Sequence, residues 1–244
     1  MTTEGRLATA PRGRAFLTAR WTNLCLLTYA VPPELLRPRL PPGLELDLRD
    51  GSAFVSLVAF NFLDTRVLGV AWPGYRNFAE LNLRFYVRHH GQRGVVFIRE
   101  FVPQRLVAGL ARLIYNEPYL AAPITHSVEE VGDRIVATCR LTFAGKTHSI
   151  RVEAQRQPYR PAEDSSEHFF KEHSWGFGKD RRGRLIRYEV HHPVWDAYPV
   201  ISHALDLDAA AVYGREWGFL AAARPYSVVH AVGSAVAVYP KGRA

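Results

Sequence analysis

The sequence predicts a mainly antiparallel α+β domain, in which a large curved sheet or barrel carries a few short helices. Three observations predict it: a strand whose polar residues fall on every second position, two β-hairpin patterns, and one clear helical stripe. No linker, repeat or low-complexity tract divides the 244 residues. We therefore expect a single domain over residues 15–240, preceded by a loose N-terminal segment, residues 1–14.

The first half of the chain predicts one short helix and three strands, after an apolar stretch at residues 21–29. We expect them at residues 31–36, 51–62, 79–90 and 95–101. Prolines favour the start of the helix, and Pro38 ends it. The strands are rich in Val, Phe, Tyr and Leu. Residues 91–94, Gly-Gln-Arg-Gly, form the expected turn of the first hairpin.

The rest of the chain predicts its clearest helix, a second hairpin and a last strand. Residues 103–115 carry Leu106, Leu110 and Leu113 in one helical stripe, and Pro118 marks the stop. The hairpin pairs residues 133–143 with 147–155 around Ala-Gly-Lys. Further elements are expected as a strand at 185–191, a short helix near 207–213 and a strand at 234–239.

Composition favours a cytoplasmic protein with reduced cysteines. Cys25 and Cys139 have no metal-ligand spacing, and we expect both in the core as free thiols. The N-terminus lacks the apolar segment of a signal peptide, and no apolar run reaches the length of a transmembrane helix. We expect no membrane association.

The formal charge of +8 raises the possibility of a nucleic-acid or acidic partner. The 31 basic residues comprise 27 Arg and 4 Lys, and they are scattered along the chain, a bias that also marks proteins from GC-rich genomes. No recognised nucleic-acid motif accompanies the charge, so nucleic acid is a weaker prediction than a small molecule.

Polar residues occupy one face of the strand at 79–90, namely Glu80, Asn82, Arg84, Tyr86 and Arg88. A polar strand face normally meets water. It could instead line the inside of a barrel, where a carboxylate beside an arginine orients a small anionic or carbonyl-bearing ligand. Both interpretations bury the opposite, apolar face.

A second cluster of candidates contains histidines and aromatic residues, namely His173, Trp175, Tyr188, His192 and Trp195. Imidazole titrates near neutral pH, so these histidines can act as acids and bases, or they can be satisfied core residues. The five-residue step between His168 and His173 fits no standard zinc spacing, and we expect no metal.

Several classes of chemistry lack their motifs. The chain has no glycine-rich phosphate loop, no dinucleotide fingerprint and no Gly-x-Ser-x-Gly elbow, so nucleotide-dependent and serine-hydrolase chemistry are disfavoured and we expect no cofactor. Lysine is scarce. Lys146, Lys171 and Lys179 lie inside the predicted fold, and turn residues beside two of them suggest exposure.

These residues resemble the YqjF-like family of uncharacterised proteins, also called domain of unknown function 2071. The resemblance covers roughly residues 19–239. Its motifs are Leu-Pro-Pro-Gly-Leu at 40–44, Val-Ser-Leu-Val at 55–58, Glu-Leu-Asn-Leu-Arg-Phe-Tyr-Val at 80–87, Gly-Val-Val-Phe at 94–97, residues 112–115 with Pro118-Tyr119, Cys139-Arg140, His-Ser-Trp-Gly at 173–176, Tyr-Glu-Val at 188–190 and His-Pro-Val-Trp at 192–195.

The family is similar in fold to acetoacetate decarboxylase, a cone-shaped antiparallel β barrel with its active site inside. The resemblance implies an interior site here and favours the inward interpretation of Glu80 and Arg84. Decarboxylases of that fold place Pro-Lys-Lys after a helix, and the first lysine forms a Schiff base. The matching residues here are Pro118-Tyr119-Leu120-Ala121. Tyr119 cannot form an imine, so the resemblance does not extend to that mechanism.

The sequence thus predicts a small-molecule site inside the barrel, for a carbonyl or carboxylate compound. The expected catalytic residues are Glu80, Tyr119 and His173, and the expected ligand-binding residues are Asn82, Arg84, Tyr115, Arg140, Trp175 and His192. The protein is either a lysine-independent lyase or isomerase or a non-catalytic ligand-binding protein. A homo-oligomer is compatible with the sequence.

Overall fold

The computed structural model describes residues 13–243, with the backbone alone at residues 113–115 and 243. The strands are β1 (Leu17–Val31), β2 (Glu45–Leu46), β3 (Ala53–Val67), β4 (Phe78–His89), β5 (Gln92–Val102), β6 (Tyr119–Ala121), β7 (Ile124–Val131), β8 (Arg134–Phe143), β9 (Lys146–Gln155), β10 (Trp175–Lys179), β11 (Leu185–His191), β12 (Ala197–Tyr198), β13 (Val200–Asp206), β14 (Ser227–Val238) and β15 (Gly242–Arg243). The helices are α1 (Pro33–Leu36), η1 (Arg37–Arg39), α2 (Arg105–Tyr115), α3 (Ser166–Lys171), α4 (Ala209–Tyr213) and η2 (Arg215–Ala221).

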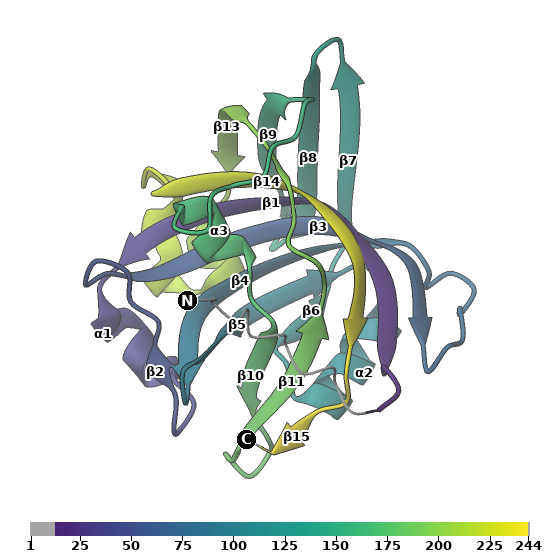
Figure 1. The fold of residues 1–244 in the computed structure, drawn as a ribbon, viewed down its shortest axis with the longest axis vertical. Helices are drawn as coiled ribbons and strands as arrows, with labels where there is room; N and C mark the ends of the chain where they lie inside the picture. Colours follow the sequence, from purple (N-terminus) through teal and green to yellow (C-terminus); the bar gives the residue numbers. More distant parts are fainter. Residues whose placement is uncertain (1–12, 244) are drawn as a thin grey trace, which may run out of the picture.

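The larger sheet curls until its ends meet. Strands β14, β1, β3, β4, β5, β10 and β11 pair in this order, and β11 pairs again with β14, Val190 opposite Val238. These strands form a strand ring (Figure 1). Its neighbours are antiparallel except β5 and β10, which run parallel. The predicted fold class, a mainly antiparallel and barrel-like α+β protein, is confirmed.

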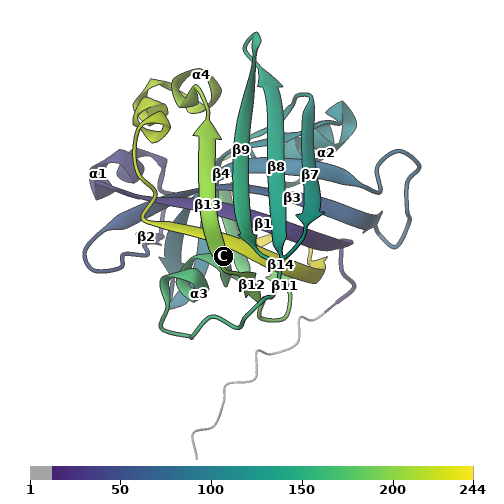
Figure 2. The same cartoon turned by 90° about the horizontal axis from the view of Figure 1, so that it is seen from above.

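A second sheet, in the order β13, β9, β8 and β7, lies across the outside of the strand ring. Figure 2 shows its strands running steeply across β1 and β3. Alternate residues of β8 and β9, among them Cys139, Leu141 and Val152, are buried against the ring in the main hydrophobic core. The two sheets therefore pack face to face around one apolar layer, as in crossed β-sandwiches.

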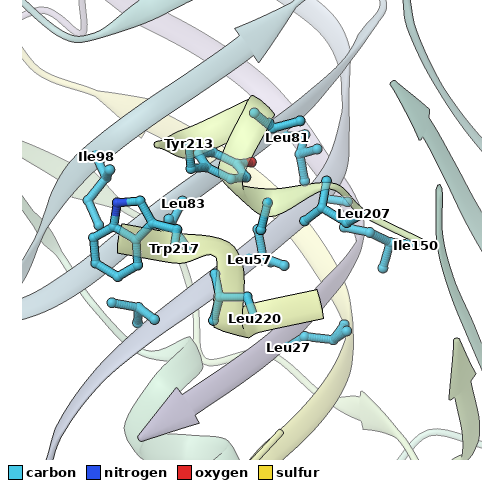
Figure 3. Packing of buried hydrophobic residues seen from close by; sticks show 14 of the residues in the cluster. Leu27, Leu57, Leu81, Leu83, Ile98, Ile150, Leu207, Tyr213, Trp217 and Leu220 are labelled. Atoms are coloured by element: carbon cyan, nitrogen blue, oxygen red, sulfur yellow. The ribbon is translucent and has the colours of Figure 1, made fainter. Parts of the chain in front are cut away.

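Along β3 and β4, successive side chains alternate between this core and the interior of the ring. Odd positions such as Leu57 and Leu83 belong to the main core, where side chains of α4 and η2, including Trp217, pack over them (Figure 3). Even positions such as Val58 and Asn82 face the other way, into the ring. Each strand thus supports an apolar outer core and a separate inner surface.

Most expected elements are confirmed. The second hairpin turns at Ala144 and Gly145 with φ of 51° and 77°, the left-handed geometry of a two-residue hairpin turn. The final strand begins at Ser227 rather than at residue 234. Strands β1, β7, β10 and β13, the short strands β2, β6, β12 and β15, and the helices η1, α3 and η2 were not predicted. Cys25 and Cys139 are buried and free, as expected.

The expectations of a loose N-terminal segment and of no membrane-spanning helix can be compared with the described residues only. Apart from Gly13 and Arg14, the N-terminal segment expected to be loose lies outside them. Within residues 13–243, every helix is too short or too polar to span a bilayer.

Candidate functional site

A cavity of about 400 Å³ lies inside the strand ring, and all the strands of the ring contribute to its wall. Helix α2 and the end of α3 complete it. Most of the wall is apolar. Its polar side chains are Glu80, Asn82, Arg84, Glu100, Glu117, Tyr119, Lys171, His173, Tyr188 and His192. The polar face of β4 therefore points inward at Glu80, Asn82 and Arg84, whereas Arg88 is exposed and pairs with the buried Asp47.

Glu80 is the centre of the polar group. Its side chain is buried, and both carboxylate oxygens accept hydrogen bonds: Oε1 from Asn82 Nδ2 at 2.9 Å and Oε2 from the Tyr119 hydroxyl at 2.9 Å. Asn82 shares the inward face of β4, and Tyr119 begins β6. These two donors fix the carboxyl plane of Glu80 toward the cavity.

A β-bulge brings a second carboxyl group to Glu80. Arg84 pairs with Phe97, but Leu83 pairs with Arg99, so Ile98 is an extra residue in β5. The shift places Glu100 opposite Asn82 and beside Tyr119 of the next strand. The carboxyl groups of Glu80 and Glu100 hydrogen-bond each other. Such a bond needs one shared proton, because two carboxylates are both acceptors.

A third carboxyl group comes from Glu117, between α2 and β6. Asn116 ends the helix in the left-handed conformation, and Pro118 then docks on β5 by accepting from the Glu100 backbone N–H at 3.1 Å. The Glu117 side chain is buried and hydrogen-bonds the Tyr188 hydroxyl. Tyr188 lies across Gly176, where a Cβ atom would meet its ring at 2.2 Å. Glycine at this position therefore makes room for the tyrosine.

Burial of these carboxyl groups alters their acidity. Burial raises the pKa of Glu80 to about 7, although Asn82, Tyr119 and Arg84 act in the opposite direction. Burial, and then the charges of Glu80 and Glu117, raise the pKa of Glu100 well above its ordinary value. Burial also raises the pKa of Glu117 to about 8. The cluster therefore holds protons at neutral pH and can exchange one with a ligand.

Arg84 supplies the positive charge at the other end of the inward face of β4. It donates from Nη2 to the Phe170 carbonyl at 3.2 Å, and its Nε is buried without a partner among the described residues. Within residues 13–243, no carboxylate lies close enough to Arg84 for an ion pair. The guanidinium keeps donors available for an anionic ligand group.

The remaining polar residues are already engaged or neutral. Lys171 is fully buried and forms an ion pair with Glu172, whose Oε1 also accepts from the Trp195 backbone N–H at 3.1 Å. Burial, followed by the charges of Arg93 and Arg84, lowers the pKa of His173 well below its ordinary value. His173 is thus a neutral hydrogen-bonding group. No set of three or more potential ligands among the described side chains is arranged to hold a metal ion.

An aromatic wall continues from the polar group. It consists of Trp21, Phe60, Phe62, Phe78 and Trp195, all of which line the cavity. The rings contact one another, Phe62 and Phe78 being stacked at 4.6 Å and Trp21 meeting Phe60 edge-on at 5.2 Å. Their contacts join the five rings into one continuous apolar surface.

The structure brings together seven of the nine side chains that the sequence singled out. They are Glu80, Asn82, Arg84, Tyr119, His173, Trp175 and His192. The side chain of Tyr115 lies outside the described part of the structure. Arg140 is not in the cavity, contrary to its predicted role. It is exposed on β8, because the neighbours Cys139 and Leu141 take the buried positions of that alternating strand.

Three polar cavity residues were missed as site candidates, Glu100, Glu117 and Lys171. Glu100 lies on a predicted strand, but the bulge that turns it inward leaves no local pattern. Tyr188 was noted only as a neighbour of the histidines. Lys171 was noted only as one of three lysines inside the predicted fold, although its place directly after Phe169 and Phe170 indicated burial.

Comparisons with known proteins agree with this architecture. Residues 18–235 match domain of unknown function 2071, described as an uncharacterized conserved protein. The uncharacterized protein YqjF of Bacillus subtilis (strain 168) is 30% identical over 193 residues, which cover 76% of each chain.

Solved structures share the fold at low sequence identity. The acetoacetate decarboxylase of Legionella pneumophila superposes with a TM-score of 0.60 at 16% identity, over 96% of this chain and 91% of that chain. The enduracididine biosynthesis enzyme MppR, complexed with pyruvate, gives 0.64 at 16% identity, over 97% and 93%. An acetoacetate decarboxylase-like enzyme from Sphingomonas wittichii RW1 gives 0.63 at 14% identity, over 100% and 99%.

Proposed function

The chain belongs to the YqjF-like family, domain of unknown function 2071, and we propose that it is an enzyme acting on a small oxo acid. The ligand carries a carbonyl group and a carboxylate, and the reaction is a proton transfer next to the carbonyl, as in a lyase or isomerase without a covalent lysine. The observation that carries the proposal is the buried carboxyl cluster, in which the pKa of Glu80 is raised by burial to about 7. A general base of this acidity is matched to neutral pH.

Arg84 is the proposed anchor of the ligand carboxylate. Its guanidinium is partly buried, and among the described residues it lacks a carboxylate partner. Charge-assisted hydrogen bonds from an arginine hold a carboxylate in a fixed orientation. The solved complex of the fold relative MppR contains pyruvate, a 2-oxo acid, which supports this ligand chemistry.

Glu80 then removes the proton beside the carbonyl group and returns it later. The protonated carboxyl of Glu100 and the hydroxyl of Tyr119 are donors that can stabilise the negative charge on the carbonyl oxygen. Burial, and then the nearby Glu100 and Glu80, raise the pKa of Tyr119 well above its ordinary value, so its hydroxyl stays protonated. The sequence resemblance matches Tyr119 with the nucleophilic lysine of the decarboxylases, and we expect Tyr119 to act as a hydrogen-bond donor instead.

The test is deuterium incorporation into pyruvate and 3-oxobutanoate in heavy water, followed by NMR. We expect the wild-type protein to catalyse exchange, and Glu80→Gln to lose it by about a hundredfold or more while retaining ligand binding. Glu129→Gln is the matched control, because Glu129 is exposed on β7. Equal loss of exchange and binding in Glu80→Gln would mean that Glu80 only recognises the ligand. Exchange that persists in Glu80→Gln would refute its catalytic role.

A further inference from the structure

We propose that the natural ligand is amphipathic, an oxo acid whose other substituent is an alkyl chain or an aryl group. The inference rests on the proposed function for the head group and adds the class of substrate. It follows from the size of the cavity, the order of its lining residues and the position of its opening.

The cavity is far larger than an oxo acid head group requires. Its volume of about 400 Å³ falls within the range of about 300–1,000 Å³ typical of sites for drug-sized ligands. A water molecule takes about 30 Å³ of liquid volume, and pyruvate has only six non-hydrogen atoms. A head group bound between Glu80 and Arg84 therefore leaves most of the cavity unfilled.

The strands arrange the lining in a fixed order from charged to apolar. The inward positions along β4 are, in order, Arg84, Asn82, Glu80 and Phe78. Successive members of this series are two positions apart in the sequence, which corresponds to about 6.6 Å along the strand. On β3, Phe60 lies opposite Glu80 and Phe62 opposite Phe78. A carboxylate on Arg84 and a carbonyl beside Glu80 thus direct the rest of the molecule onto the aromatic wall.

The opening of the cavity continues this apolar path. Among the described lining residues, the two most exposed are Leu68, at 57%, and Leu110, at 44%. Leu68 follows the end of β3, beyond Phe62, and Leu110 lies on α2. Val107 and Ala111, on the same helix, also line the cavity. The route from Glu80 to solvent therefore passes along hydrophobic side chains, which suits an apolar chain better than a polar one.

The experiment measures binding of straight-chain 2-oxo acids from pyruvate to 2-oxodecanoate by isothermal titration calorimetry. We expect the dissociation constant to fall about fourfold for each added methylene until the chain reaches the opening. Leu110→Asp should weaken the binding of the long acids by a much larger factor than the binding of pyruvate. The matched control is Leu106→Asp, because Leu106 is exposed on α2 and does not line the cavity.

The outcomes separate this inference from the proposed function. Dissociation constants that do not depend on chain length, or equal effects of Leu110→Asp and Leu106→Asp, overturn the amphipathic ligand and leave the oxo acid head group in place. Primary alcohols of the same chain lengths test the head group. If the alcohols bind as tightly as the oxo acids, and Arg84→Gln weakens neither, the assignment of the head group is wrong. Absence of binding by every oxo acid overturns both.

Discussion

Replacing Glu117 by Gln should stabilise the folded protein at alkaline pH and have little effect in acid. Burial raises the pKa of Glu117 from 4.5 to about 8. When folding raises the pKa of a carboxyl group, that group adds its full contribution to the stability of the folded protein at a pH below its pKa in the unfolded chain. The contribution is lost as the pH rises through the pKa of the group in the folded protein. Glutamine is an uncharged substitute that can still accept from Tyr188.

The magnitude follows from the difference between the two pKa values. At about 1.4 kcal/mol per pH unit, the interval from 4.5 to about 8 corresponds to up to about 5 kcal/mol in favour of the variant at high pH. At about pH 8, where half of the Glu117 groups remain protonated, about 4 kcal/mol is expected, and at about pH 5 less than about 1 kcal/mol.

The assay is urea unfolding of both proteins at about pH 5 and about pH 8, followed by circular dichroism. Glu129→Gln is the control for removing a carboxylate from the surface. The quantity to compare is the difference in unfolding free energy between variant and wild type, because the contributions of titrating groups distant from Glu117 cancel in it. A difference for Glu117→Gln that is the same at both pH values would refute the raised pKa and weaken the proposed chemistry of the cluster.

Two further predictions concern other buried groups. Burial lowers the pKa of His126 to about 4, so the stability that the neutral imidazole contributes is present above about pH 6.5 and is lost as the pH falls toward 4. In urea unfolding, the unfolding free energy of His126→Leu should therefore rise relative to that of the wild type by up to about 3 kcal/mol across this interval. A difference that stays constant with pH would contradict this. Gly176→Ala should lower the free energy of unfolding by about 1–3 kcal/mol and reduce the proton exchange described above, because the added Cβ would meet the Tyr188 ring at 2.2 Å. Gly178→Ala is the control, because the atom nearest to a Cβ at that position is 3.7 Å away. If Gly176→Ala and Gly178→Ala melt at the same temperature, the packing argument fails.

The sequence contained enough information for the fold and for part of the site. The period of two in residues 79–90 predicted β4 and both of its faces, and the family motifs favoured the inner position of Glu80 and Arg84. The misplacement of Arg140 was avoidable. Its strand alternates regularly between buried apolar and exposed polar residues, so the pattern itself assigns Arg140 to the outside.

The other carboxyl groups could not be found in this way. Counted from the turn of the first hairpin without a bulge, Asn82 pairs with Arg99, and Glu100 belongs to the outer face. The bulge depends on packing across several strands, which no local pattern records. Glu117 lies in a connection after a helix, and its burial depends on the docking of Pro118 against β5. Both residues acquire their role from contacts between distant segments.

The bulge in β5 makes the acidity of the cavity depend on the register between β4 and β5. If β5 lost the bulge but kept Ile98 in the ladder, the register of Arg84 with Phe97 would continue and place Arg99, instead of Glu100, opposite Asn82. Arg99 now faces outward and donates to the Val212 carbonyl of α4. Turned inward, its guanidinium would neutralise Glu80 and return that carboxyl to an ordinary acid. Among relatives with a β5 strand of the same length, the presence or absence of the bulge would therefore separate chains with a proton-holding cavity from chains with a salt bridge in its place.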